Sequence, residues 1–465
     1  MTKSAKIETT LAYVGGGSLN WARVLMADLI HDGAINAEVR LYDLDLAAAQ
    51  RNADLGNRYS KKYGAAIRYV VAKSLEDALG GSEFVVISFL PGTFDDMTND
   101  IDLPAREGIR QSVGDSVGPG GFIRSMRAIP AMVEVAEAIK RYCPQAYVCN
   151  LTNPMSVLTG ALYAAFPEIR AWGECHEVTK LKHLVAAFAN SQPGAERISY
   201  DQVDINVLGI NHFTFVDSAF AAGRDWLPDY VEFARRHRDE GWRETPLNAD
   251  SEEDGYFEDW NRVKFDLTAR LGIAAAAGDR HLSEFVPASW YLDEAEKWKF
   301  GLTPVDWRRR NRAEIQKADR LAEEQNVLPD LAGRSEEALV AQIRALSRGE
   351  TLIVNANLPN RGQVEGLPPG AIVETNVMFS GTGIHPIHAG RLPLAAEALV
   401  RPHAERQNIL LQAVLDGDLP ALENLFLTDP LVAAIGPQRG VRLFRSMVAA
   451  TSHCLPVSLR LPAGA

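Results

Sequence analysis

The sequence has little of what disulfide-rich, membrane-spanning or nucleic-acid-binding proteins need. Only four of its 465 residues are cysteine, which is typical of a reducing compartment rather than of a disulfide framework. No apolar run reaches the roughly 20 residues of a membrane helix, and the polar N-terminus has no apolar signal core. A net charge of -12 does not suit a polyanionic partner. We therefore expect a soluble, cytoplasmic protein with no membrane or nucleic-acid partner.

The chain contains enough apolar material for two domains. Its 465 residues, 46% of them hydrophobic, are too many for one simple domain and sufficient for two. Residues 11–174 alternate strand-like apolar runs with helical segments, a pattern that favours a parallel doubly wound sheet. Beyond about residue 200 this alternation stops. We predict an α/β fold: an N-terminal Rossmann sheet of the lactate/malate dehydrogenase type over 1–200 and a C-terminal α+β domain over 201–465.

One glycine-rich segment interrupts the alternation. Residues 90–124 include five glycines between 108 and 121 and also carry Asp115. We expect a long loop here, and a long loop inside a compact domain usually has a function. Further along, residues 203–208 and 212–220 are predicted to be strands joined by the turn Gly209-Ile210-Asn211-His212.

A second glycine-rich turn follows the first predicted strand and precedes a helix. Its residues are Gly15-Gly16-Gly17-Ser18. Glycine lets a backbone approach a pyrophosphate, and the helix N-terminus offers free N–H groups. Asp43, at the end of the second strand, suits the ribose hydroxyls of NAD and disfavours the 2′-phosphate of NADP. We predict that Gly15, Gly17, Ser18 and Asp43 bind NAD; a tight turn without a ligand is the alternative.

Cys175 and His212 form the candidate metal site. Cys175 follows the predicted strand 169–174, at the sheet edge where parallel sheets bind ligands. Thiolate and imidazole are good ligands for a divalent first-row metal. Taken alone, each has an ordinary alternative, a buried cysteine or a hydrogen-bonded turn histidine. Together, beside a nucleotide motif, they predict a metal whose other positions are left to substrate oxygens and water.

Several motifs in this order resemble those of the family 4 glycoside hydrolases, the NAD- and divalent-metal-dependent glycosidases that lie outside the two-carboxylate scheme. The resemblance covers the chain from Leu11 to Pro393. Residues 278–285 (GDRHLSEF) are most similar to the α-galacturonidase-like branch. Besides the first glycine turn, the motifs are Asn153-Pro154-Met155, Gly173-Glu174-Cys175-His176, Gly209-Ile210-Asn211-His212, Leu367-Pro368 and Gly390-Arg391-Leu392-Pro393.

The resemblance implies hydrolysis of an α-glycoside, with an α-galacturonide favoured. NAD would take a hydride from C3 of the sugar, the C1 substituent would be eliminated after loss of the C2 proton, water would add, and the hydride would return. The metal, for which manganese is the family expectation, would stabilise the enediolate. The resemblance further implies a homodimer or homotetramer, with residues 201–465 binding substrate and metal and forming oligomer contacts.

The resemblance also implies roles for residues near the metal site. His176 would protonate the leaving oxygen, and an imidazole at this place goes with α-glycosidases; a hydrogen bond supporting the site is the alternative. Asp266 is the first candidate for the base at C2, Tyr256 is its rival, and Asp259 stays open. A solvated helix face is the alternative for Asp266.

Substrate contacts are expected from Asn153 and from basic residues. Asn153 would bind sugar hydroxyls, although Asn-Pro is also a common turn pair. Arg280 is our first choice for a uronate carboxylate, because its planar fork matches that group, with His281 beside it. The other available cations are Arg110, Arg124, Arg127 and Arg361.

Three other functions stay open at this stage. The first is a family 4 enzyme acting on another sugar, as an α-glucosidase, α-galactosidase or α-glucuronidase. The second is a 2-hydroxy-acid dehydrogenase of the lactate/malate type, which would not need the metal. The third is a non-catalytic NAD-binding regulator, which metal-dependent turnover would exclude.

Overall fold

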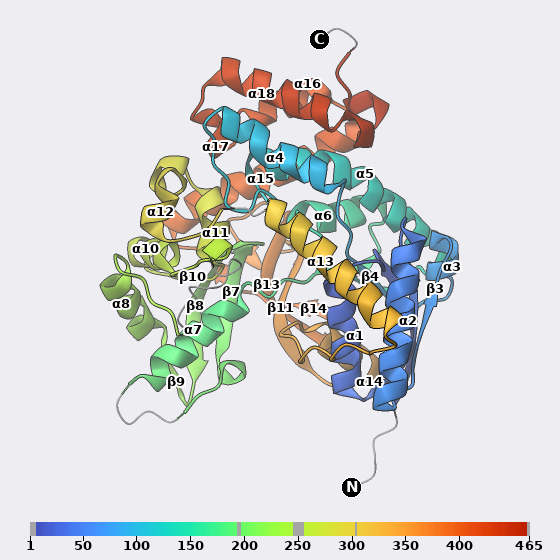
Figure 1. Cartoon of the computed structure of the whole chain (residues 1–465). Helices are drawn as coiled ribbons and strands as arrows, with labels where there is room; N and C mark the ends of the chain where they lie inside the picture. Colours follow the sequence, from blue (N-terminus) through green and yellow to red (C-terminus); the bar gives the residue numbers. More distant parts are fainter. Residues whose placement is uncertain (1–5, 193–196, 245–254, 303–304, 463–465) are drawn as a thin grey trace.

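The computed structural model describes residues 6–192, 197–244, 255–302 and 305–462. Its centre is a nine-stranded sheet whose first six strands are parallel in the order β3-β2-β1-β4-β5-β6 (Figure 1). This is the Rossmann strand order, so the predicted fold class is confirmed. The strands are β1 (Ile7–Val14), β2 (Ile35–Tyr42), β3 (Ile67–Val71), β4 (Phe84–Ile87), β5 (Tyr147–Asn150) and β6 (Arg170–Gly173).

Helices cover both faces of this sheet because its strands are apolar on both sides. In β1, Leu11 and Tyr13 belong to the core shared with α1 and α14, whereas Ala12 and Val14 belong to the core shared with α5 and α6. This alternation is the period of two that a strand imposes. The helices of the first half are α1 (Trp21–Asp32), α2 (Leu46–Tyr63), α3 (Leu75–Leu79), α4 (Phe94–Arg106), α5 (Gly118–Tyr142), α6 (Met155–Ala165) and α7 (Thr179–Asn190).

Three strands from the second half extend the same sheet. They are β11 (Leu352–Pro359), β13 (Ile372–Ser380) and β14 (Gly383–Pro386), and β11 pairs antiparallel with β6 through Asn357 and Gly173. The chain thus returns across the predicted boundary at residue 200 to complete the first sheet. The division into 1–200 and 201–465 therefore stays a prediction.

The rest of the second half forms a small sheet with surrounding helices, as the predicted α+β character requires. Figure 1 shows this sheet beside the large one and the last helices above α4 and α5. Its strands are β7 (Asp204–Ile210), β8 (Phe213–Ala221), β9 (Arg224–Asp225) and β10 (Ala274–Ala275), and β12 (Val364–Glu365) pairs with β15 (Gly390–Arg391). The helices are α8 (Leu227–His237), α10 (Arg262–Leu271), α11 (Asp279–Leu282), α12 (Ala295–Trp298), α13 (Val305–Glu324), α14 (Leu339–Arg348), α15 (Leu394–Asp416), α16 (Leu419–Phe426), α17 (Pro430–Ala433) and α18 (Pro437–Ala450).

The long loop expected over residues 90–124 is wrong. Helix α4 occupies 94–106 and α5 begins at Gly118, so only the segment between them is irregular. A capping box starts α4: the Asp96 amide donates to Thr93 Oγ1 at 3.2 Å, and the Thr93 amide donates to Asp96 Oδ2 at 2.8 Å. In contrast, the turn predicted between strands at residues 209–212 is confirmed by β7 and β8.

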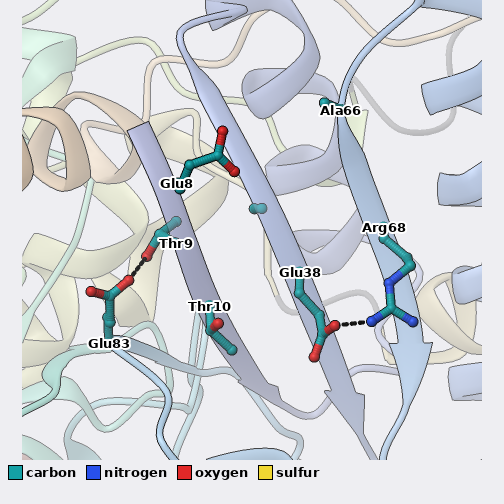
Figure 2. A pocket seen from close by; sticks show the side chains of 8 residues that line it. Glu8, Thr9, Thr10, Glu38, Ala66, Arg68 and Glu83 are labelled. Atoms are coloured by element: carbon teal, nitrogen blue, oxygen red, sulfur yellow. Dashed lines mark hydrogen bonds and ion pairs between the residues drawn. The ribbon is translucent and has the colours of Figure 1, made fainter. Parts of the chain in front are cut away.

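A surface hollow lies at the amino ends of the first strands. It has a volume of about 420 Å³ and is lined by three glutamates, Glu8, Glu38 and Glu83 (Figure 2). Thr9 Oγ1 donates to Glu83 at 2.8 Å, and Arg68 pairs with Glu38. Open α/β sheets bind ligands at the carboxyl ends of their strands, so the functional site is expected at the opposite edge.

None of the helices in the described ranges combines the length and apolar character needed to cross a membrane.

Replacing Gly15 by alanine is expected to destabilise the fold. An added Cβ would lie 1.8 Å from the carbonyl oxygen of Ser88, and the φ of +96° disfavours any other residue. We expect the free energy of unfolding to fall by about 3 kcal/mol or more in chemical denaturation. Gly333→Ala is the matched control, since its Cβ would meet nothing within 4 Å. Equal losses for the two variants would contradict the close approach at Gly15.

Candidate active site

The glycine-rich turn lies against the end of β2. The amides of Gly15 and Gly16 both donate to the carbonyl of Tyr42 at 2.8 Å, and the Gly17 amide donates to Asp43 Oδ2 at 2.9 Å. A Cβ on Gly16 would come within 2.6 Å of the Leu41 Cβ. The sequence therefore folds into a tight strand–turn–helix cradle with a carboxylate at its rim, the shape that a dinucleotide needs.

Ser18 stabilises this turn through two hydrogen bonds. Its Oγ accepts a hydrogen bond from the Trp21 amide at 3.2 Å, and its carbonyl accepts from the buried side chain of Asn52 at 2.8 Å. The four residues predicted to bind a dinucleotide are thus brought together at the start of α1.

Cys175 and His212 approach each other from two different elements. Cys175 follows β6, and His212 occupies the β7–β8 turn with a φ of +63°. Cys175 Sγ and His212 Nε2 are 3.3 Å apart. This confirms the expectation that the two side chains meet; their role as metal ligands stays a proposal.

A hydroxyl relay determines which nitrogen of His212 is available. Ser116 Oγ donates to Asp115 Oδ1 at 2.8 Å and lies 2.8 Å from His212 Nδ1. Because the hydroxyl has a single proton, it accepts from Nδ1–H, and Nε2 keeps its lone pair toward Cys175. Burial lowers the pKa of His212, which favours the neutral imidazole. This is the tautomer that a metal ligand requires.

Asp115 and His281 extend the Cys175–His212 pair into a cluster. The ligating atoms of Asp115, His212 and His281 lie within 4.8 Å of one another. The His281 ring stacks on His212 with centroids 3.7 Å apart, and its buried Nδ1 has no hydrogen-bond partner. Sequence reasoning gave Asp115 no role and placed His281 on the sugar. Both are candidates for additional metal ligands, because carboxylate and imidazole groups bind divalent metals.

Protonation in this cluster follows from burial and neighbouring charges. Burial lowers the pKa of His281 to about 3. Burial raises the pKa of Asp115, but His281 and Arg124 lower it by more, so the carboxyl stays ionised. Burial, reinforced by Glu374, raises the pKa of the Cys175 thiol well above its ordinary value. A thiolate would form here only beside a cation, and the donor set therefore fits a divalent metal.

Asn153 lies at the edge of this cluster, in the cis Asn153–Pro154 turn before α6. Its Nδ2 donates to Asp115 Oδ2 at 3.3 Å, and its buried Oδ1 has no hydrogen-bond partner. The predicted substrate residue is therefore adjacent to the candidate metal ligands, with an unused acceptor.

His176 is held by a glutamate that sequence reasoning missed. Its Nδ1 lies 2.7 Å from Glu337 Oε1, in the segment that precedes α14. This hydrogen bond raises the pKa of His176, although burial opposes it. The imidazole is therefore held by one nitrogen and leaves Nε2 for another partner, as an acid–base group requires.

Asp266, the first choice for the base, already has two side-chain partners. It is buried on α10, where its Oδ2 accepts from Arg270 Nε at 2.6 Å and from the Tyr291 hydroxyl at 2.8 Å. Lys264, two residues earlier on the same helix, donates from Nζ to Asn261 Oδ1 at 2.9 Å, so the two side chains have different partners. The assignment of Asp266 as the base stays a prediction, and its two hydrogen bonds count against it.

The two other base candidates lie on the segment before α10. Asp259 Oδ2 accepts a hydrogen bond from the amide of Asp279 at 3.1 Å, and Asp279 precedes His281 by two residues. Asp259 Oδ2 and Lys180 Nζ both lie close to Gly278. Tyr256 is 36% exposed, and its backbone packs against Gly301. Asp259 thus contacts α11, the helix that carries His281.

Arg280 is near the cluster, but backbone oxygens already occupy its guanidinium. Its Nε donates to the Gly301 carbonyl at 3.1 Å and its Nη2 to the Ser112 carbonyl at 2.7 Å. The predicted carboxylate fork is thus used to join two segments of the site, which counts against its assignment to the substrate.

Comparison with known proteins identifies the family. Residues 10–191 match the model of the family 4 glycosyl hydrolases, and residues 207–432 match the C-terminal domain of the same family. The chain belongs to the family 4 glycosyl hydrolases. The family inferred from the motifs is therefore confirmed, and this excludes the dehydrogenase and regulator alternatives.

Within this family the chain is similar to proteins of several specificities. It is 42% identical over 456 residues to the alpha-galacturonidase of Thermoanaerobacterium saccharolyticum, covering 96% of this chain and 97% of that protein. LplD from Bacillus subtilis, known from a crystal structure, is 42% identical to this chain with a TM-score of 0.89; the match covers 96% of this chain and 100% of LplD. A 6-phospho-alpha-glucosidase from gut microorganisms, solved in complex with NAD and Mn²⁺, has a TM-score of 0.80 at 16% identity, with coverage of 98% and 100%.

Removing either member of the Cys175–His212 pair is expected to weaken metal binding. We expect Cys175→Ser and His212→Asn to raise the dissociation constant for Mn²⁺ at least about tenfold, since loss of a supporting residue alone costs 10–100-fold in metal sites. Electron paramagnetic resonance of free Mn²⁺ measures this. The control is Cys143→Ala, in the apolar core beside α5. Unchanged affinity in both site variants would contradict the assignment.

Proposed function

We propose that this protein hydrolyses α-galacturonides and uses bound NAD and a divalent metal such as Mn²⁺. The observation that carries the proposal is the Cys175–His212 pair, 3.3 Å apart, with the His212 tautomer set by Ser116. Identity of 42% to a protein named alpha-galacturonidase over almost the whole chain supports the substrate class. The substrate itself is a small carbohydrate, and we propose a homodimer or homotetramer.

The residues that would hold the cofactors follow from the contacts above. Gly15, Gly17 and Ser18 would hold the NAD pyrophosphate, and Asp43 the adenosine ribose. Cys175 and His212 would hold the metal, with Asp115 and His281 within reach. Bound NAD supplies a hydride acceptor that is regenerated in each turnover, and the divalent cation stabilises negative charge on sugar oxygens.

The chain's own side chains supply the proton transfers. His176 donates a proton to the leaving oxygen from Nε2, because Glu337 occupies Nδ1. The free Oδ1 of Asn153 accepts from a sugar hydroxyl next to the metal ligands. Asp259, Tyr256 or Asp266 takes the proton from C2; the hydrogen bonds of Asp266 to Arg270 and Tyr291 favour the other two.

Hydrolysis is expected to need both cofactors. Nitrophenyl α-glycosides of galacturonate, galactose, glucose and glucuronate would be assayed after metal removal, with and without NAD and Mn²⁺, under reducing conditions. We expect release of nitrophenol from the galacturonide only when both are present. If no glycoside is cleaved, and NADH instead accumulates with a hydroxy acid whatever the metal, the proposal is wrong.

Loss of Glu337 should affect substrates according to their leaving groups. We expect Glu337→Ala to lower kcat on α-linked digalacturonate by about 100-fold, within the range for acid catalysis. Nitrophenyl α-galacturonide should change little, because nitrophenolate leaves without a proton.

The matched control for this test is Glu336→Ala. Glu336 belongs to the same segment but pairs with His183 at 2.6 Å, away from His176. Equal losses on the two substrates in Glu337→Ala would show that Glu337 supports the fold rather than the orientation of His176.

A further inference from the structure

Three arginines lie within electrostatic reach of Asp115, the carboxylate in the cluster with His212 and His281. Burial lowers the pKa of Arg124, Arg280 and Arg308, and the charge of Asp115 acts on all three in the opposite direction. The three come from different helices: Arg308 lies in the first turn of α13, Arg124 on α5 and Arg280 on α11. Asp100 also acts on Arg124, and Glu284 and Asp259 act on Arg280, whereas Asp115 is the one carboxylate of the described residues whose charge acts on Arg308.

Two of the three guanidinium groups already have partners in the backbone. Arg124 Nε donates to the Asn153 carbonyl at 3.1 Å. Arg280 donates from Nε to Gly301 and from Nη2 to Ser112, as described above. These two side chains therefore hold loops of the site in place.

Arg308 differs from both. Its Nε is buried without a hydrogen-bond partner, and no carboxylate of the described residues forms an ion pair with it. Its Cζ lies 5.5 Å from the centroid of Phe257, a ring that Arg280 also contacts at 4.7 Å. The side chain is thus packed against an aromatic ring while its Nε–H has no acceptor among the described residues. Arg308 is half-buried, and burying a polar donor without an acceptor is costly, so the unsatisfied Nε–H calls for an explanation, for which a ligand is one candidate.

We propose that Arg308 binds the carboxylate of the sugar and thereby selects a uronide over the neutral glycoside. This inference rests on the proposed function. A hexuronate carries its carboxylate across the ring from the C2 and C3 hydroxyls, so it needs an anion site close to the metal ligands but separate from them. The planar fork of arginine matches a carboxylate with two parallel hydrogen bonds. Arg308 replaces Arg280 in this role, because the fork of Arg280 is occupied.

The test compares substrates that differ only at C6. Wild type, Arg308→Ala and Arg308→Lys, each loaded with NAD and Mn²⁺, would be assayed on nitrophenyl α-galacturonide, its methyl ester, α-galactoside and α-galactoside 6-phosphate. In Arg308→Ala we expect kcat/KM to fall about 100-fold on the galacturonide and to change less than about threefold on the galactoside. Arg308→Lys should be intermediate, since an ammonium keeps the charge but lacks the fork.

Ligand binding gives a second measurement that does not need turnover. Calorimetry on the loaded enzyme should show a loss of galacturonate affinity of about 100-fold in Arg308→Ala, with galactose affinity unchanged. The control is Arg309→Ala, since Arg309 pairs with Asp95 at 2.8 Å and Asp306 at 3.2 Å on the exposed side of α13. Its substrate preference should equal that of wild type.

Stability separates a ligand-binding role from a structural one. Because Arg308 has no ion-pair or hydrogen-bond partner among the described residues and only its contact with Phe257 to lose, its removal should leave the thermal unfolding temperature nearly unchanged or raise it. A lowered temperature together with equal losses on all substrates would show a structural role and overturn the inference. Preference of the wild type for the 6-phosphate, or unchanged discrimination in Arg308→Ala, would overturn it as well. Failure of the wild type to cleave any galacturonide would instead refute the proposed function.

Discussion

The site depends on the approach of one thiol and one imidazole. Cys175 comes from the end of β6 and His212 from the turn between β7 and β8, so the two sheets must meet at a fixed angle to leave 3.3 Å between Sγ and Nε2. The orientation is fixed in turn by Ser116, which joins His212 to Asp115.

Much of this could be predicted from the sequence because the signals are local. The alternation of strands and helices, the turn at Gly15 and the residues that end β6 and β7 are each encoded within a few positions. Cys175 and His212 could be paired because both fall at chain reversals that follow strands. The residues predicted for the dinucleotide turn are likewise neighbours in sequence or at the ends of adjacent parallel strands.

What could not be predicted depends on direction or on distant pairing. A helix turns by about 100° per residue, so Lys264 and Asp266 point to different sides of α10, and the sequence does not say which side meets the site. The capping box of Thr93 and Asp96 that starts α4 was missed because the glycines at 108–121 dominated the interpretation of the whole segment. The sequence does not distinguish Arg280 from Arg308. The structure does, because Arg280 donates to two backbone carbonyls whereas Arg308 Nε has no hydrogen-bond partner among the described residues.

The pairing of β11 with β6 has a consequence for the chain as a whole. Since β11 covers β6 on its outer side, the strand leading to Cys175 is internal to the sheet only when the second half is present. A fragment ending near residue 200 would present β6 as an open edge with unpaired amides and carbonyls, ready to add a strand from another molecule. The first 200 residues are therefore not expected to fold as a portable module, and truncation between β6 and β11 should be poorly tolerated.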